Sequence, residues 1–335
     1  MKTSEMEYTQ LIKNIREDIY HIDIPIEHPL KNLNIYLFMG EEPALIDAGP
    51  YHPLLVEVME EVLRRLKVNK LSRILITHSH IDHFGLADRL RRLTGAEVLS
   101  HHAERPRMER VEEHMREEYD CYTSLAPAMD FPEEFVHMMA ALPQIWVTLS
   151  EPCPLDGRLR GGEYLKAGDR ELEAIHTPGH TAGHLCFYER EEGLLFSGDH
   201  LMRTITPNPE LYCPPRDGQI TGLPQFLDSL RLLKSLPATC AYPGHGRFIK
   251  DVQGRVDMNI LHHERRLEKT EQAVSEGCQT VWEVSEYLFP QIRGVSPGVD
   301  HLLAIKEALG HLVMLEEKGV VKSFIEKKPW RYLPV

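Results

Sequence analysis

Hydrophobic and polar positions alternate between two patterns over the first hundred residues. Short runs rich in Ile, Leu and Tyr are too short for helices and predict strands at residues 18–25, 34–40, 43–49 and 72–78. Apolar residues at helical spacing predict one helix from Pro53 to about Lys67 and a second over 82–95, ended by Gly95. This alternation of strands and helices predicts an α/β protein.

Residues 103–148 interrupt that alternation. They read as two helices separated by a Pro/Asp turn, and several methionines fall on one face of each helix. We expect an insertion, which is either a helical hairpin packed on the body or a lid over an active site. As a lid, its methionines would build an apolar pocket.

The strand pattern returns in the second half of the chain, at residues 171–178, 184–190, 193–199 and 239–246, with a helix over 223–237. Three further helical runs and a closing β-pair follow residue 251. We therefore expect a domain over residues 1–252, with its insertion at about 103–148, and a second domain over 253–335.

Composition narrows the class of protein. The 335 residues carry a net charge of −13, with 51 acidic and 38 basic side chains, which disfavours a long-range field that gathers nucleic acid. The N-terminus lacks an apolar signal region, and no stretch approaches the ~18 uninterrupted apolar residues of a membrane span. We expect a soluble cytoplasmic protein that does not bind a membrane.

Cysteine and histidine usage points toward metal chemistry. The six cysteines form no Cys-x-x-Cys pair, so we expect free and mostly buried thiols. The 19 histidines are unusually many, and several are concentrated in THSHIDH (77–83), directly after a predicted strand. Three later strand ends, HTPGHTAGH (176–184), SGDHL (197–201) and YPGHG (242–246), supply further histidines and aspartates beside Gly and Pro. Such loops can turn their ligands toward one metal.

These four motifs, preceded by LIDAG, resemble the metallo-β-lactamase superfamily in order and spacing over roughly residues 16–250. The resemblance implies an αββα sandwich with a helical insertion and a small C-terminal winged-helix domain. It assigns one metal ion to His78, His80 and His180. It assigns a second to Asp82, His83 and His245, with Asp199 as the bridge between the two.

The same resemblance implies the cofactors and the chemistry. Two divalent metal ions are expected, zinc first, with manganese or iron as alternatives. They would activate a water molecule as the nucleophile, with Asp82 and Asp199 as the catalytic carboxylates. The candidates for orienting ligands or contacting substrate are Asp47, His184, His200 and Arg203. His262 and His263 match no ligand motif, so we expect surface or packing roles for them.

Three functions follow from these features. A dizinc hydrolase of a small ester, thioester or lactone is the first, because the apolar insertion would suit such substrates. An endoribonuclease acting on single-stranded RNA is the alternative, because residues 254–335 resemble the winged-helix domain of a branch with ribonuclease-like members. A ligand-sensing DNA-binding protein is third, since the expected recognition helix is not basic. The winged helix could instead close a homodimer.

Overall fold

Two β-sheets form the body of the computed structural model, which describes residues 10–26 and 30–335. In these residues the first sheet has seven strands in chain order, antiparallel up to β4 and parallel from β4 to β7: β1 (Ile12–Asn14), β2 (Ile19–Pro25), β3 (Asn32–Phe38), β4 (Ala44–Ile46), β5 (Arg73–Leu75), β6 (Glu97–His101) and β7 (Gly157–Leu159).

The second sheet has five strands in the order β14-β11-β10-β9-β8. Among the described strands of this sheet, only the β11–β14 pair is parallel. The strands are β8 (Tyr164–Ala167), β9 (Arg170–His176), β10 (Leu185–Glu189), β11 (Leu194–Gly198) and β14 (Cys240–Pro243).

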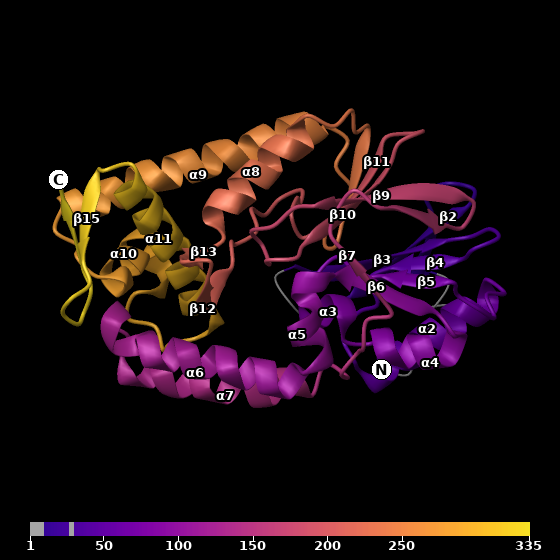
Figure 1. The fold of residues 1–335 in the computed structure, drawn as a ribbon, viewed down its shortest axis with the longest axis horizontal. Coiled ribbons are helices and arrows are strands. Elements are labelled where there is room, and N and C mark those ends of the chain that lie inside the picture. The colour runs from indigo at the N-terminus through magenta and orange to yellow at the C-terminus, as the bar shows by residue number, and fades with distance from the viewer. Residues whose placement is uncertain (1–9, 27–29) are drawn as a thin grey trace.

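The two sheets pack face to face, and helices cover their outer faces (Figure 1). Side chains of both sheets, among them Phe38, Phe187 and Phe196, fill the core between them. Helices α2 (Pro53–Arg65) and α4 (Ala87–Thr94) cover the first sheet, while α8 (Leu223–Lys234) and α9 (Val252–Ser275) cover the second. The predicted αββα sandwich is therefore confirmed.

The predicted helix over residues 82–95 is wrong in one respect, because it is two helices, α3 (Ile81–Phe84) and α4. The His83 carbonyl accepts hydrogen bonds from the backbone N–H groups of Ala48 (2.7 Å) and Gly49 (3.2 Å), and Leu86 N–H donates to the Gly49 carbonyl (2.8 Å). These long-range bonds replace the i→i−4 bonds that would continue the helix. Gly95 ends α4 in the left-handed conformation, as predicted.

The insertion consists of helices α5 (Arg105–Glu109), α6 (Val111–Met129) and α7 (Glu133–Val147), with a left-handed turn at Asp130. It packs against the C-terminal elements, which are α10 (Val281–Leu288), α11 (Val299–Glu317) and the hairpin β15 (Val321–Phe324) and β16 (Arg331–Pro334). The ring centroids of Phe135 and Trp282 lie 5.5 Å apart at this contact. The insertion and the C-terminal segment therefore share a hydrophobic core.

The methionines of the insertion are buried in two cores. Met108 and Met115 belong to the core beneath the first sheet, and Met129 and Met139 belong to the core shared with the C-terminal helices. The helices do carry apolar faces, as predicted, but these faces pack against the two cores and stabilise the fold. The hypothesis that these methionines build an apolar substrate pocket is therefore wrong.

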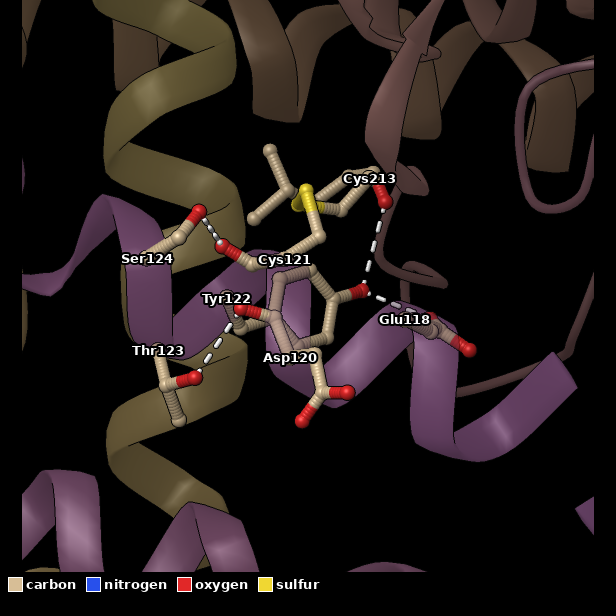
Figure 2. The surroundings of a disulfide bond; sticks show 8 residues. Glu118, Asp120, Cys121, Tyr122, Thr123, Ser124 and Cys213 are labelled. Atoms are coloured by element: carbon tan, nitrogen blue, oxygen red, sulfur yellow. Dashed lines mark hydrogen bonds between the residues drawn. A yellow bond between two sulfur atoms is a disulfide. The ribbon is translucent and has the colours of Figure 1, made fainter. Parts of the chain in front are cut away.

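One cysteine pair corrects the expectation of free thiols. Cys121 of α6 and Cys213 of β12 (Leu211–Arg216) form a disulfide, with their Cα atoms 5.6 Å apart (Figure 2). Beside it, the Tyr122 hydroxyl donates to a Glu118 carboxylate oxygen at 2.7 Å. Strand β12 pairs with β13 (Gln219–Thr221), a short hairpin that the sequence pattern did not predict. Disulfides are rare in reducing compartments, so this bond disagrees with the cytoplasmic expectation.

Among residues 10–26 and 30–335, no helix is both long and apolar enough to cross a bilayer.

Replacing Cys121 by Ser should lower the free energy of unfolding by about 2–4 kcal/mol, because the disulfide closes a long loop and constrains the unfolded chain. Thermal unfolding of the two proteins without reductant measures this difference. Cys240→Ser, which changes a free thiol, is the control and should leave the melting temperature unchanged. Equal melting temperatures for all three proteins would contradict a formed disulfide.

Candidate metal centre

Four loops meet at one edge of the two sheets. One loop follows β5, one joins β9 to β10, and the other two follow β11 and β14. Each loop follows a buried strand whose position is set by the core, so the polar side chains beyond the strand ends are carried to the same place. All seven ligands expected from the sequence come from these loops.

The first group contains His78, His80 and His180. The Nε2 atom of His78 lies 2.9 Å from Nδ1 of His80, and Nε2 of His180 lies 3.2 Å from that same atom. Zinc–nitrogen bonds of 2.0–2.1 Å place tetrahedral ligands about 3.4 Å apart, so this spacing fits one ion. Burial, with a smaller contribution from neighbouring histidines, holds the pKa of His78 and His80 well below its usual value. Both are therefore neutral, as a ligating imidazole must be.

The second group contains Asp82, His83 and His245. Oδ2 of Asp82 lies 3.2 Å from Nε2 of His245 and 4.0 Å from Nε2 of His83. Both imidazoles are buried, whereas Asp82 is partly exposed. This group offers two nitrogen atoms and one carboxylate to a second ion.

Asp199 lies between the two groups. Its Oδ1 is 3.5 Å from Nε2 of His83, and its Oδ2 is 3.5 Å from Nε2 of His245 and 3.9 Å from Nε2 of His180. Burial alone would raise the pKa of the Asp199 carboxyl, but His245 and His83 hold it well below its usual value. The ionised carboxylate is therefore placed to reach a cation in either group.

Three buried atoms at this centre accept or donate no hydrogen bond among the described residues: Nε2 of His83, Nε2 of His245 and Oδ1 of Asp199. Buried polar atoms are normally paired, because leaving one unpaired costs about 1–3 kcal/mol. Nε2 of His83 lies 3.5 Å from Oδ1 of Asp199, and Nε2 of His245 lies 3.5 Å from Oδ2 of the same carboxylate, so a cation bound among them would satisfy all three atoms. This observation supports a metal centre held by these residues.

Asp47 fixes the orientation of the second group. Its carboxylate oxygen Oδ2 accepts a hydrogen bond from Nδ1 of His83 at 2.8 Å, and its Oδ1 accepts one from the backbone N–H of Thr77 at 2.9 Å. Burial lowers the pKa of His83, but the carboxylates of Asp199, Asp47 and Asp82 outweigh burial and raise it well above its usual value. The concentration of negative charge around this ring favours cation binding.

Backbone carbonyl groups fix two more rings. Nδ1 of His180 is 2.9 Å from the carbonyl oxygen of Asn208, and Nδ1 of His245 is 2.7 Å from that of Asn32. A carbonyl can only accept, so each Nδ1 carries the hydrogen and each Nε2 keeps its lone pair toward the centre.

The remaining candidates take different positions. His184 Nε2 accepts a hydrogen bond from the backbone N–H of Asp199 at 3.1 Å, so His184 helps to position that residue. His200 is buried with its ring 4.3 Å from that of Phe226, and neither of its nitrogen atoms has a described hydrogen-bond partner. Arg203 is exposed on the segment that follows.

Glu104 was not among the sequence candidates, although it connects two of the ligand loops. Its carboxylate accepts hydrogen bonds from the backbone N–H groups of Ser79 (2.9 Å) and Gly183 (2.5 Å), and it is almost completely buried. Ser79 lies between two ligands of the first loop, and Gly183 lies in the loop that carries His180. A glutamate at a helix start has no sequence feature that signals this bridging contact.

A pocket of about 260 Å³ adjoins the centre between the insertion and β12. Ser79 and Thr181, which neighbour the ligands, line it together with Arg107, Glu118 and Glu210. Nη2 of Arg107 is 2.8 Å from Glu118 and its Nη1 is 3.6 Å from Glu210, to which Lys306 Nζ also lies at 3.3 Å. The insertion therefore borders the centre with charged side chains.

Comparisons with known proteins show which family this chain resembles. A sequence profile described as the metallo-beta-lactamase superfamily matches residues 30–245. "Probable metallo-hydrolase YqjP" of Bacillus subtilis is 26% identical over 92% of this chain and 96% of its own. "Atrochrysone carboxyl ACP thioesterase" of Aspergillus fumigatus is 25% identical over 72% of this chain, which spans 59% of that protein.

Solved structures show the same likeness. The metallo-beta-lactamase family protein TTHA1429 from Thermus thermophilus superposes with a TM-score of 0.79 and 32% identity, over 96% of this chain and all (100%) of that one. A beta-lactamase domain protein from Burkholderia ambifaria gives a TM-score of 0.80 at 22% identity, over 97% and 93% of the two chains, and shows the fold alone. The profile match covers more than half of the sequence, and this chain belongs to the metallo-β-lactamase superfamily.

Proposed function

We propose that this protein is a binuclear metal-dependent hydrolase that cleaves a small ester, thioester or lactone. The observation that carries the proposal is the convergence of seven side chains that can bind metal, three of which have a buried atom without a hydrogen-bond partner among the described residues. A mononuclear site would need only one of the two groups. Both groups are complete here, and Asp199 reaches each of them.

The ligands divide between two positions. His78, His80 and His180 would hold one ion, and the other would be held by Asp82, His83 and His245, with Asp199 shared. Zinc fits the predominance of imidazole ligands, and manganese or iron would accept the same set. When bound, such a pair would lower the pKa of a coordinated water toward neutrality and would polarise the substrate oxygen.

The chain's own residues prepare the site for this chemistry. The Asp82 and Asp199 carboxylates offset the charge of two dications at close range. Asp47 and the carbonyl groups of Asn32 and Asn208 keep the lone pairs of three imidazoles directed at the centre. The loops arrive on rigid strands, so little conformational freedom remains to be lost when the ions bind.

The neighbouring pocket supports a small polar substrate. Its cavity volume of about 260 Å³ suits a compact molecule. The Arg107 guanidinium lies in its wall and could bind a carbonyl or carboxylate of the substrate. The fungal relative that is named a thioesterase supports the thioester among the candidate substrates.

The pocket gives no support to RNA as the substrate. Four glutamates line it (Glu104, Glu117, Glu118 and Glu210) against three arginines (Arg107, Arg110 and Arg216), so the lining has no excess of positive charge to hold a phosphodiester chain. Burial raises the pKa of Glu210, but Lys306 and Arg107 outweigh burial and lower it to about 2, so this carboxylate stays ionised.

Changing Asp199 to Ala should reduce turnover at least about a hundredfold and lower the metal content per chain, because it removes the shared ligand. Metal analysis is combined with assays of a short acyl thioester, a lactone, bis-(p-nitrophenyl) phosphate and a single-stranded RNA. Asp228→Ala, an exposed aspartate of α8, is the control and should match the wild type. Hydrolysis that survives in Asp199→Ala, or cleavage of RNA alone, would refute the proposal.

Changing Asp47 to Asn should weaken metal affinity about 10–100-fold. The neutral amide replaces the carboxylate that accepts a hydrogen bond from Nδ1 of His83, so the orientation of this ring is held less firmly. Competition with a chelator measures the affinity. Turnover should recover when excess metal is added, since Asp47 is not itself a ligand. A variant that remains inactive when fully loaded with metal would show that Asp47 does more than orient His83.

A further inference from the structure

A second pocket, of about 440 Å³, lies between α9 and the segment that follows Asp199. Helix α9 runs along one side of the molecule (Figure 1). Four cationic side chains line the pocket: Arg255, Arg265, Arg266 and Lys269. None of its lining residues is Asp or Glu, although the whole chain carries a net charge of −13. This concentration of positive charge is unlike the rest of the protein.

Three of the four cationic side chains have no ion-pair partner in the described residues, and Arg255 is the most buried of these three. Its Nε donates to the Met202 carbonyl at 2.6 Å and its Nη2 donates to the Ile205 carbonyl at 2.7 Å. No carboxylate lies within ion-pair distance of it in the described part of the chain. Burial lowers its pKa, which is the cost of holding a cation without a counter-ion. An anion in the pocket would remove that cost.

Arg265 and Lys269 add two further charges at i and i+4, which places them on the same face of α9. Arg265 forms no ion pair in the described ranges, and Lys269 contacts only the Leu288 carbonyl, at 3.5 Å. Side chains that carry like charge on neighbouring turns repel one another. A multivalent anion would bring both into favourable contact.

Glu307 lies beneath this pocket and accounts for the fourth cation. Its Oε1 is 3.4 Å from Nε of Arg266 and 3.4 Å from Nε2 of His262. The side chains of His262, His263 and Glu307 have the spacing of a metal site. Three unpaired cations border the same space, so a metal ion there would be repelled while an anion would be attracted. Glu307 balances Arg266 and leaves the other three charges unmatched.

We propose that this pocket binds a phosphate monoester whose organic group is apolar. Arginine presents paired N–H donors that match the oxygen atoms of a phosphate, and the exposed Thr204 hydroxyl can add another donor. Met258 and Leu261 line the same pocket and are 61% and 42% exposed, which offers apolar surface to the organic group. This inference does not depend on the proposed hydrolase activity.

The test uses calorimetric titration of the metal-loaded protein with inorganic phosphate and with n-hexyl phosphate. Hexyl phosphate should bind more tightly, because it also covers Met258 and Leu261. The double variant Arg265→Ala/Lys269→Ala should bind it at least about tenfold more weakly, since two charge-assisted contacts are lost. Arg116→Ala/Lys318→Ala removes the same charges from exposed positions outside the pocket and should bind like the wild type.

Two results would overturn the proposal. Binding that persists in the pocket variant and disappears in Asp199→Ala would place the phosphate at the metal centre. A bound metal ion that is lost in Glu307→Gln, together with no phosphate binding, would assign the cluster of His262, His263 and Glu307 to a cation. Neither result bears on whether Asp199→Ala abolishes hydrolysis.

Vesicle sedimentation and competition with RNA identify the source of the phosphate. Sedimentation with phosphatidylcholine vesicles that contain phosphatidic acid, but not with phosphatidylcholine alone, would support the proposal with a lipid headgroup as the source of the phosphate. Binding of hexyl phosphate without sedimentation would support a soluble metabolite. Single-stranded RNA that displaces hexyl phosphate with a steep salt dependence would overturn the monoester in favour of a polynucleotide.

Discussion

Face-to-face packing of the two sheets is the contact on which the candidate site depends. The rings of Tyr36 and Phe196 meet edge to face with centroids 5.1 Å apart, and such a pair contributes about 0.5–1.5 kcal/mol beyond the area it buries. The Tyr36 hydroxyl also donates to the Pro243 carbonyl at 2.6 Å, two residues before His245. Because each ligand group takes residues from both sheets, such as His78 with His180 and His83 with His245, the groups are assembled only where the sheets are packed together.

A second constraint acts on the imidazole rings. Asp47 and two backbone carbonyls accept from the Nδ1 atoms of three histidines, and this fixes which nitrogen carries the hydrogen before any cation arrives. Of the opposite nitrogen atoms, Nε2 of His83 and Nε2 of His245 are buried without a hydrogen-bond partner among the described residues. Each such atom costs folding free energy, and metal binding returns that cost as affinity. The same unpaired atoms therefore lower the free energy of unfolding of the metal-free protein and raise its affinity for metal.

The sequence predicts those parts of the site whose chemistry lies in side chains next to strand ends. THSHIDH could be recognised because three histidines and an aspartate fall within a few positions, and YPGHG because Pro and Gly flank its histidine. Asn32 and Asn208 act through their backbone carbonyls, which every residue possesses, so no sequence pattern distinguishes them. The disulfide joins cysteines separated by 92 positions, and only the packing of α6 on β12 brings them together. The helical faces of the insertion indicated burial correctly but could not show which core would bury them.

One segment connects the features that sequence reasoning treated separately. After Asp199 the chain borders the pocket of Arg255, Arg265 and Lys269, here called the basic pocket, at Thr204. It then supplies the Asn208 carbonyl to His180 and reaches the pocket beside the metal centre at Glu210. Arg255 contacts this segment through the Met202 and Ile205 carbonyls, a few residues before the Asn208 carbonyl that accepts from His180. Coupling between two binding sites is reciprocal: if an anion changes the affinity for metal by some factor, metal changes the affinity for the anion by the same factor. The basic pocket and the metal centre share this segment of the chain, although no residue lines both.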